Sequence, residues 1–268
     1  MFSSVAAGFS PRCVQEVERG LKPATYNSPT MAITLYGVDG CRGGWIVAKS
    51  DSDFRDVSFA IVSELRPLFE AAGPHVLIAI DIPIGLPVNE PRFCDRQARQ
   101  ILGLRRSSVF SPPARSVLNT RNYPAALRMN RQILGTGISK QAFHIMRKIG
   151  EVDAVIDRAK QRYIREAHPE VTFAQLSGRP MEHYKKTAAG RCERIALLQR
   201  FLPFIDDEWL ARERSNLRRS GHVAADDLVD ALACLVTAFH VHSGRHRSLG
   251  RGDQTDSNGL LMEIVTCV

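Results

Sequence analysis

Residues 33–50 read ITLYGVDGCRGGWIVAKS, and this stretch predicts the β-hairpin around which the rest of the chain is arranged. Its first apolar run is β-prone, and a single carboxylate, Asp39, stands where that strand should end. A glycine-rich turn, residues 40–44, follows and tolerates the backbone angles that tight hairpin turns require. Aspartate is also a favoured turn residue, so this stretch alone leaves Asp39 open between a structural and a functional role.

A buried strand that ends in an acid occurs again downstream. Residues 75–80 read HVLIAI, a continuous apolar run typical of a strand covered on both faces, and Asp81 follows directly. The next segment contains Pro83 and Pro87, which lack the N–H donor that a β-ladder needs. The chain should therefore leave the sheet immediately after Asp81 and expose that carboxylate at the sheet edge.

A third group of acids belongs to an apolar helix expected at residues 223–240. Between Asp227 and His240 its only charged residue is Asp230, so this helix should be buried nearly all round. An isolated carboxylate in that setting is costly unless it is paired, hydrogen-bonded or bound to a metal ion. Asp226 and Asp227 could instead be capping residues at the helix N-terminus. Asp230 is therefore the acid of this group for which we expect a function.

Length and composition indicate an ordinary globular protein. The chain has 268 residues, 44% of them hydrophobic, which is enough for a sizeable core. No apolar run approaches about 18 residues, so we expect no membrane span. The six cysteines form no CxxC pair, which favours free thiols and a cytoplasmic location. Residues 1–30 resemble no targeting signal, and we expect a poorly ordered leader there.

The net charge of +8 is concentrated in one acid-free segment, residues 96–150. Its basic residues are Arg96, Arg99, Arg105, Arg106, Arg115, Arg121, Arg128, Arg131, Lys140, Arg147 and Lys148. Surface helices commonly carry both signs of charge, so this segment favours contact with a polyanion, and a solvated basic face is the alternative. We expect a nucleic-acid partner. The charge pattern does not separate DNA from RNA or specify an oligomeric state.

Periodicity and turn residues place the remaining elements. Further strands are expected at 57–62, at 259–265 and, interrupted by a proline, at 164–173. Helices are expected at 63–72, 92–102, 125–134 and 139–159, and two more should follow Gly190 and Asp206, with Ser63 and Ser139 among the N-caps. This order predicts an α/β fold, in which a mixed sheet combines antiparallel hairpin strands with parallel strands.

Acids at neighbouring strand ends favour metal-ion chemistry. Strands lie about 4.8 Å apart, so Asp39 and Asp81 should be close together, and Asp227 and Asp230 share one helix face. Four carboxylates repel one another unless a cation neutralises them. Oxygen ligands favour Mg²⁺ or Mn²⁺ over zinc. A pair of such ions would suit attack of water on a phosphodiester.

Six motifs along the chain resemble a known family: GVDGCRGGW, AIDIPIGLP, CDRQARQILGLRRSSVFSPPAR, HPEVTF, KKTAAGR and DDLVDALA. From about residue 33 to residue 265 the chain resembles the domain of unknown function 429, a family described as predicted RNase H-like nucleases. The resemblance implies a single RNase H-like domain over residues 31–268. That domain would have helices on both faces of a mixed sheet and a basic helical insertion at about residues 88–165.

The resemblance also implies roles for individual residues. The run 230–233, DALA, is similar to a signature in the last helix of bacterial Holliday-junction resolvases. The metal ligands it implies are Asp39, Asp81, Asp227 and Asp230. Resolvases carry a Glu in place of Asp81, and helix geometry alone does not choose between Asp226 and Asp227. Further catalytic candidates are His168 and Glu170 of HPEVTF, with His168 as a proton carrier or a structural histidine.

The substrate-binding candidates are mostly basic. They are Arg42, Arg105, Arg106, Ser107, Arg115, Lys185 and Lys186. We expect the hydroxyl-rich loop 107–115 to lie nearest the scissile phosphate, because flanking arginines can grip two phosphate oxygens at once.

Three functions are compatible with these patterns. The first is a nuclease that uses Mg²⁺ or Mn²⁺ to hydrolyse phosphodiester bonds. The second is a nucleotide-binding protein of the actin-like ATPase and sugar-kinase group, in which a glycine-rich first hairpin cradles phosphate. The third is a non-catalytic module that binds nucleic acid or protein. No second hairpin of the required type follows, and the set of acids is intact, so we expect the first.

Overall fold

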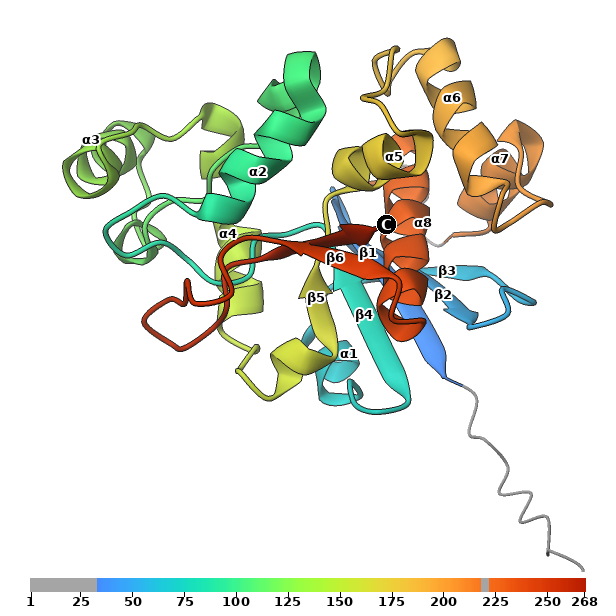
Figure 1. The fold of residues 1–268 in the computed structure, drawn as a ribbon, viewed down its shortest axis with the longest axis horizontal. Helices are drawn as coiled ribbons and strands as arrows, with labels where there is room; N and C mark the ends of the chain where they lie inside the picture. The colour runs from blue at the N-terminus through green and yellow to red at the C-terminus, as the bar shows by residue number, and fades with distance from the viewer. Residues whose placement is uncertain (1–32, 218–221) are drawn as a thin grey trace, which may run out of the picture. The chain divides into compact units, whose positions relative to one another are not determined.

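The computed structural model describes residues 33–217 and 222–268, which belong to one compact unit, Ala32–Val268 (Figure 1). The expected leader, residues 1–30, lies outside the described residues. None of the helices in the described part of the chain combines the length and the apolar character that a membrane span requires.

The centre of the unit is a five-stranded sheet with the order β3-β2-β1-β4-β5. Its strands are β1 (Thr34–Cys41), β2 (Gly44–Asp51), β3 (Ser58–Val62), β4 (Val76–Ile80) and β5 (Ile164–Glu166). The first three pair antiparallel, and β4 and β5 extend the sheet from β1 as parallel strands. The predicted fold class, an α/β fold on a mixed sheet of hairpin and parallel strands, is confirmed.

Helices flank this sheet. The α-helices of the described residues are α1 (Arg66–Glu70), α2 (Phe93–Leu102), α3 (Tyr123–Leu134), α4 (Lys140–Asp153), α5 (Pro169–Ser177), α6 (Ala188–Leu198), α7 (Asp207–Asn216) and α8 (Ala225–His242). Three short 3₁₀ helices are η1 (Gly103–Ser108), η2 (Arg115–Val117) and η3 (Lys160–Arg162). Helices α2, α3 and α4 carry most of the acid-free segment and lie on one side of the unit, away from α6 and α7 (Figure 1).

Local signals placed several helix starts correctly. Ser139 caps α4 by accepting a hydrogen bond from the Ala142 amide at 3.0 Å. Asp206 caps α7 by accepting one from the Trp209 amide at 2.6 Å. In both cases a short polar side chain satisfies an N–H that lacks a partner inside the helix.

Four expectations about the elements are wrong. The helix expected at 139–159 is α4, which ends at Asp153. Helix α1 is shorter than 63–72 and has Leu65, not Ser63, at its N-cap position. Residues 169–173 are helical, because Pro169 takes the first position of α5, where a missing N–H costs nothing. The last strand, β7 (Ile264–Cys267), starts later than expected and pairs with β6 (His246–Leu249), which lies in a polar basic stretch.

Side-chain alternation sorts the strand residues onto two faces of the sheet. Leu35 and Ala79 belong to the core cluster that α6, α7 and α8 complete. Val38 and Ile80, an odd number of positions further along each strand, belong to the cluster on the other face, with α1 and α4. Odd-numbered residues of β1 and β4 therefore face α8.

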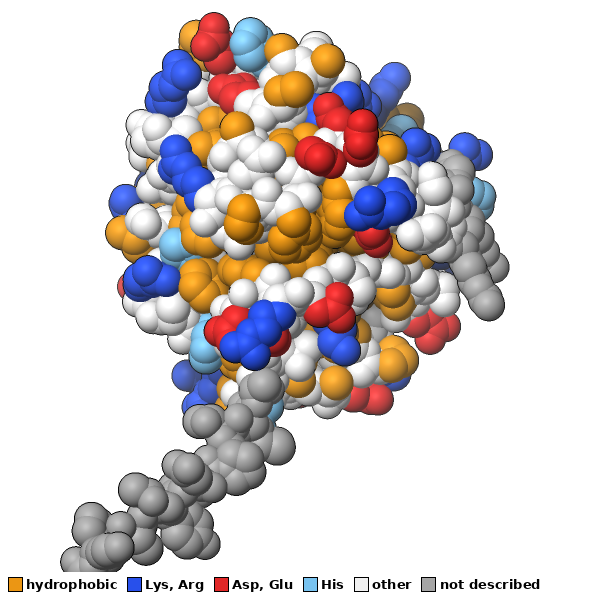
Figure 2. All heavy atoms as spheres, turned by 90° about the vertical axis from the view of Figure 1, so that its right-hand side faces the viewer, with side chains coloured by type: hydrophobic (Ala, Val, Ile, Leu, Met, Phe, Trp, Pro, Cys, Tyr) orange, Lys and Arg blue, Asp and Glu red, His pale blue; other side chains and the backbone are white. Residues whose placement is uncertain are grey.

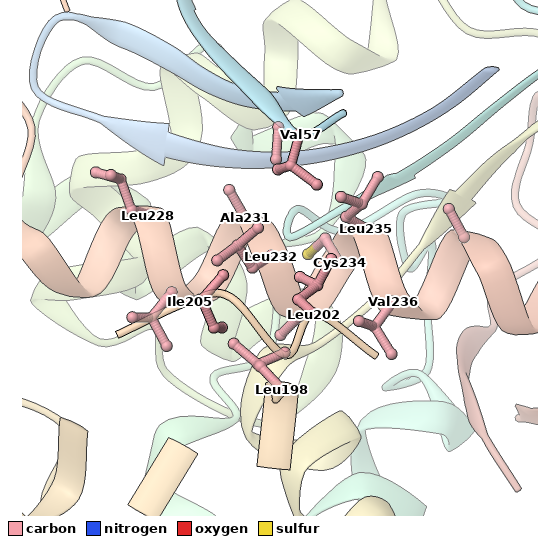
Figure 3. Packing of buried hydrophobic residues seen from close by; sticks show 14 of the residues in the cluster. Val57, Leu198, Leu202, Ile205, Leu228, Ala231, Leu232, Cys234, Leu235 and Val236 are labelled. Atoms are coloured by element: carbon pink, nitrogen blue, oxygen red, sulfur yellow. The ribbon is translucent and has the colours of Figure 1, made fainter. Parts of the chain in front are cut away.

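Helix α8 is the centre of the larger cluster. Figure 3 shows Leu198, Leu202 and Ile205 packed on one side of α8 and Val57 on the other. Apolar side chains around its circumference, such as Leu232 and Leu235, are fully buried. The prediction of a helix buried nearly all round is confirmed.

Gly37 allows α8 to approach β1 unusually closely. A Cβ at this position would overlap the carbonyl oxygen of Ala231 and the amide nitrogen of Leu235, and would lie 2.8 Å from the Leu235 Cα. Only a residue without a side chain fits there. The close contact fixes the height of α8 over the sheet next to Asp230, and so it helps to position the acidic site described below.

The side of the unit that carries α6 and α7 has charged side chains of both signs, in contrast to the acid-free segment on α2, α3 and α4. Figure 2 shows Lys and Arg interspersed with Asp and Glu on that face, around a band of hydrophobic side chains. Arg191 of α6, for example, pairs with Asp207 of α7 at 2.5 Å. This mixture is typical of an ordinary solvated surface.

Candidate active site

The register of β1 and β4 places Asp39 and Asp81 side by side. Val38 of β1 pairs with Ile80 of β4, and the residue that follows each of them in the sequence is an aspartate. The amide of Asp81 donates a hydrogen bond to the carbonyl of Val38 at 2.9 Å, which holds the two strand ends together. Both aspartates have odd numbers and thus lie on the face covered by α8.

Helix α8 contributes a third carboxylate, Asp230, to the same face, where Asp39 is buried and Asp81 is half-buried. Asp230 is 2% exposed, and its charge raises the pKa of Asp39. Asp226, one helical turn earlier, lies on the same side of α8 as Asp230. Asp227 caps the helix instead, since its Oδ2 accepts a hydrogen bond from the Ala224 amide at 2.8 Å. Its charge still reaches the site and raises the pKa of Asp39.

Lys185 supplies a positive charge to this group of acids. Its Nζ lies 2.6 Å from Oδ2 of Asp230 and 3.8 Å from Oδ2 of Asp226. Arg105 anchors the segment that precedes Lys185 in its loop. Arg105 donates hydrogen bonds to the carbonyls of Met181 and Glu182. Lys185 therefore performs part of the neutralising role that the sequence assigns to a metal ion.

Burial dominates the electrostatics of the three strand and helix acids. It raises the pKa of Asp39 well above its usual range, with the charges of Asp81 and Asp230 adding to the effect. Burial also raises the pKa of Asp81, and it raises that of Asp230 to about 6. The Lys185 ammonium opposes the rise in each case. The mutual effects show that these groups form one electrostatic site.

An open cavity of about 380 Å³ gives access to this site. Asp81, Asp230 and Lys185 line it, together with Arg105, Ser107, Ser108 and Phe110. One oxygen of Asp230, Oδ1, is buried and has no hydrogen-bond partner among the described residues. A buried carboxylate oxygen without a partner is unusual in native structures, and it marks a position where a ligand can bind.

His168 and Glu170 also line the cavity but differ in their contacts. His168 has Nε2 3.4 Å from the Ser108 carbonyl oxygen, and its buried Nδ1 has no partner among the described residues. Glu170 is held by Arg194, whose Nη2 donates to both Glu170 oxygens at 2.6 Å and 2.8 Å. Glu170 is therefore committed to an ion pair, whereas the Nδ1 of His168 is not engaged by the described residues.

A family model matches most of the chain. The model of the family described as "Protein of unknown function (DUF429)" matches residues 37–255 of the chain. The chain belongs to the DUF429 family. Comparison of the sequence with curated proteins and with solved structures gave no match. The DUF429 segment contains Asp39, Asp81, Lys185 and Asp230, so the whole acidic site lies within it.

Other predicted substrate-binding residues of this DUF429 chain lie away from the cavity. Arg42, Arg106 and Lys186 are exposed and do not line it. Arg115 forms ion pairs with Asp153 and Asp256. Its backbone amide donates a hydrogen bond to the Pro87 carbonyl at 3.0 Å and so holds the segment after β4. The guanidinium of Arg115 is thus committed to structure, and the part of loop 107–115 at the site is its beginning, Ser107 to Phe110.

Two residues of the site gave no recognisable signal in the DUF429 sequence. Arg194 is buried, pairs with Glu170 and donates to the Gly190 carbonyl at 2.7 Å, one turn earlier in α6. Gly190 itself leaves no room for a Cβ against the Tyr184 carbonyl carbon, 2.6 Å away, so it sets the path of the Lys185 loop. The glycine in KKTAAGR could have pointed to such a close approach, but the sequence does not indicate which segment approaches.

No three His, Cys, Asp or Glu side chains within residues 33–217 and 222–268 are arranged to hold a metal ion together. The Lys185 ammonium donates a hydrogen bond to Oδ2 of Asp230 at 2.6 Å and so occupies one oxygen of this carboxylate. A divalent cation would have to replace the Lys185 ammonium on Asp230.

Proposed function

We propose that this DUF429 protein is a metal-dependent phosphodiesterase that hydrolyses nucleic acid. The observation that carries the proposal is the meeting of Asp39, Asp81 and Asp230, from β1, β4 and α8, on one face of a mixed sheet beside an open cavity. Three acids brought to one place by three separate elements are costly to maintain in a protein that does not use them.

The donor set fits a hard divalent cation. All three side chains offer carboxylate oxygens, which Mg²⁺ and Mn²⁺ prefer. The buried Oδ1 of Asp230 has no hydrogen-bond partner among the described residues, so its lone pairs are available to coordinate such an ion. Asp39, Asp81 and Asp230 would hold it. A bound ion would polarise the phosphate and lower the pKa of its water, so that hydroxide forms near neutral pH.

The residues of the chain would bind the substrate and carry protons. Ser107 offers a hydroxyl at the cavity wall that can donate to a phosphate oxygen, whereas the Ser108 hydroxyl already donates to the Arg105 carbonyl at 2.9 Å. His168 lies close enough to Asp81 for the charge of His168 to lower the pKa of Asp81. The unpaired Nδ1 of His168 could accept or release a proton there. Lys185, once released from Asp230, would place its ammonium beside the bound phosphate.

Mg²⁺ or Mn²⁺ should raise the melting temperature by relieving repulsion in the native state, and Asp39→Asn and Asp230→Asn should each remove most of this effect.

A cleavage screen with branched, duplex and single-stranded substrates in both ions tests the activity itself. The same variants should lose at least about 100-fold in rate, since each removes a charge that holds the ion. Cleavage that persists in a chelator, or in both variants, would contradict the proposal.

Ion binding should depend on pH in a predictable direction. Burial raises the pKa of Asp230 to about 6 from its ordinary 3.8, so the native state holds more protons than the unfolded state between these values. Without an ion, this group therefore stabilises the protein most at low pH, and the contribution is lost as pH rises through about 6. Since an ion must displace the proton, Mn²⁺ affinity should rise from pH 5 to pH 7 and then level off, as thermal shift titrations can show.

Two other functions give different experimental results. Binding of ATP without binding of oligonucleotides, measured by calorimetry, would favour a nucleotide-binding protein of the actin-like ATPase and kinase type. Tight binding of nucleic acid without cleavage in either ion would favour a non-catalytic binding module.

A further inference from the structure

A second and larger cavity, of about 730 Å³, lies next to the acidic site. Four arginines line it, namely Arg92, Arg96, Arg99 and Arg251, and Glu90 is the only acid in its wall. Two aromatic rings, Phe93 and Phe110, also line it. The cavity thus combines positive charge with aromatic surface, and its size is that of sites for small organic ligands.

The arginines at the mouth of this cavity are available to a ligand. Arg96 and Arg251 are exposed, and in the described residues the ion pairs of the cavity wall belong to Arg92 instead. Both guanidinium groups approach the ring of Phe93, with their Cζ atoms 4.3 Å and 5.5 Å from its centre. Stacking on Phe93 holds the two guanidinium groups in place and does not use the N–H donors of Arg96 and Arg251.

The wall behind them is rigid. Arg92 is buried, and its Nη2 donates to Glu166 at 2.6 Å. Gln254 accepts a hydrogen bond from the Phe93 amide at 2.8 Å and so fixes the start of α2. Arg99 donates to the Val109 carbonyl at 3.0 Å and to the Ser111 hydroxyl at 3.0 Å. Contacts from distant parts of the chain therefore hold Phe93, Arg96 and loop 109–111 in place.

The two cavities share a wall. Ser107, Ser108 and Phe110 line the cavity of the acidic site, and Phe110 and Ser111 line the arginine cavity. A chain of phosphates that passes along residues 107–111 would therefore reach both. Arg99 keeps this loop in position through Val109 and Ser111, which links the shape of one cavity to that of the other.

We infer that the arginine cavity binds an unpaired nucleotide of the strand whose phosphodiester is cut at the acidic site. The inference rests on the proposed function and adds the class of substrate to it. Arg96 and Arg251 contact the phosphate of this nucleotide, and its base stacks on Phe93 or Phe110. A base within a duplex has both faces covered by its neighbours, so stacking on an aromatic side chain requires a single-stranded or displaced nucleotide.

The test measures binding in EDTA, where no cleavage takes place. The probes are a fluorescein-labelled 12-nucleotide single strand and the blunt duplex of the same sequence, followed by anisotropy at several NaCl concentrations. The wild-type protein should prefer the single strand. Phe93→Leu should weaken binding of the single strand by about tenfold and leave duplex binding nearly unchanged, because it removes a stacking surface but no charge.

Arg96→Ala combined with Arg251→Ala should flatten the salt dependence by about two units, since two phosphate contacts are lost. The matched control is Lys49→Ala with Arg66→Ala, which removes the same charge from exposed positions on β2 and α1 that line neither cavity. This control should change the slope much less. Circular dichroism melts of each variant separate loss of binding from loss of folding.

The outcomes distinguish this inference from the proposed function. If the preference depends on Phe93 but no substrate is ever cleaved, the arginine cavity still binds an unpaired nucleotide, and the nuclease proposal fails. If cleavage occurs while Phe93→Leu and the double arginine variant bind both probes like the wild-type protein, the inference is wrong.

Discussion

Replacing Lys185 with methionine should destabilise the protein at pH 8 in the absence of divalent ions and should make it bind Mn²⁺ more tightly. Methionine keeps the length of the side chain but removes the ammonium that lies 2.6 Å from Asp230. Asp230 then remains as a buried carboxylate without a counter-charge. Because the Lys185 side chain is 33% exposed, we expect a loss of about 2 kcal/mol, less than for a fully buried pair.

The loss should depend on pH and on the ion. At pH 5 Asp230 can take up a proton, since burial already raises its pKa to about 6, so the variant should then approach the wild-type stability. At pH 8 Mn²⁺ should restore stability by supplying the missing charge. Its apparent affinity should increase by about tenfold, because the ion no longer competes with an ammonium.

Chemical denaturation at pH 5 and pH 8, with and without Mn²⁺, measures both effects. Lys186→Met is the matched control, since Lys186 is the neighbouring residue, is exposed and does not line the acidic cavity. It should leave stability and Mn²⁺ affinity nearly unchanged. If Lys185→Met binds Mn²⁺ no better than the wild-type protein at pH 8, Lys185 does not occupy the position of an ion, and the metal site must be sought elsewhere.

The acids of this site were predictable because strand ends and periodicity are local signals. Asp39 and Asp81 each follow a β-prone apolar run, and alternation along the two strands determines which face they share. Asp230 was predictable from a different local signal, one charge in an otherwise apolar helix. Their meeting then follows from the order of strands in a mixed sheet. The sequence contains this information within short windows.

The partners of these acids were not predictable, because they depend on contacts between distant segments. Lys185 lies 45 positions before Asp230 in the chain, and nothing in KKTAAGR shows which carboxylate it meets. The partners of the acid-free segment, residues 96–150, were equally hidden in the sequence. Its excess of charge is plain in the sequence, yet Arg115 is neutralised by Asp153 and Asp256, which lie outside the segment. Net charge within a segment therefore overestimates the charge it offers to a ligand.

Gly37→Ala should strongly destabilise the protein. The new Cβ would overlap the backbone of α8 at Ala231 and Leu235, and neither is the flexible end of a side chain that could move aside. Helix α8 would have to move away from β1, which would loosen the packing of the largest core cluster. We expect a loss of about 3 kcal/mol or more in the free energy of unfolding, at the upper end of the range for overpacked cores.

The same displacement should weaken the acidic site, because Ala231 is next to Asp230, and Gly37 is two residues before Asp39 on the same face of β1. Urea unfolding measures the first effect, and a Mn²⁺ thermal shift on the fraction that remains folded measures the second. Gly150→Ala is the control, since Gly150 lies inside α4 and a Cβ there meets no atom within 4 Å. It should stabilise the protein by about 0.5–1 kcal/mol, as alanine does in a helix interior. If Gly37→Ala were as stable as the wild-type protein, α8 would not be seated on β1 at Gly37, and the position of Asp230 beside Asp39 would lose its structural basis.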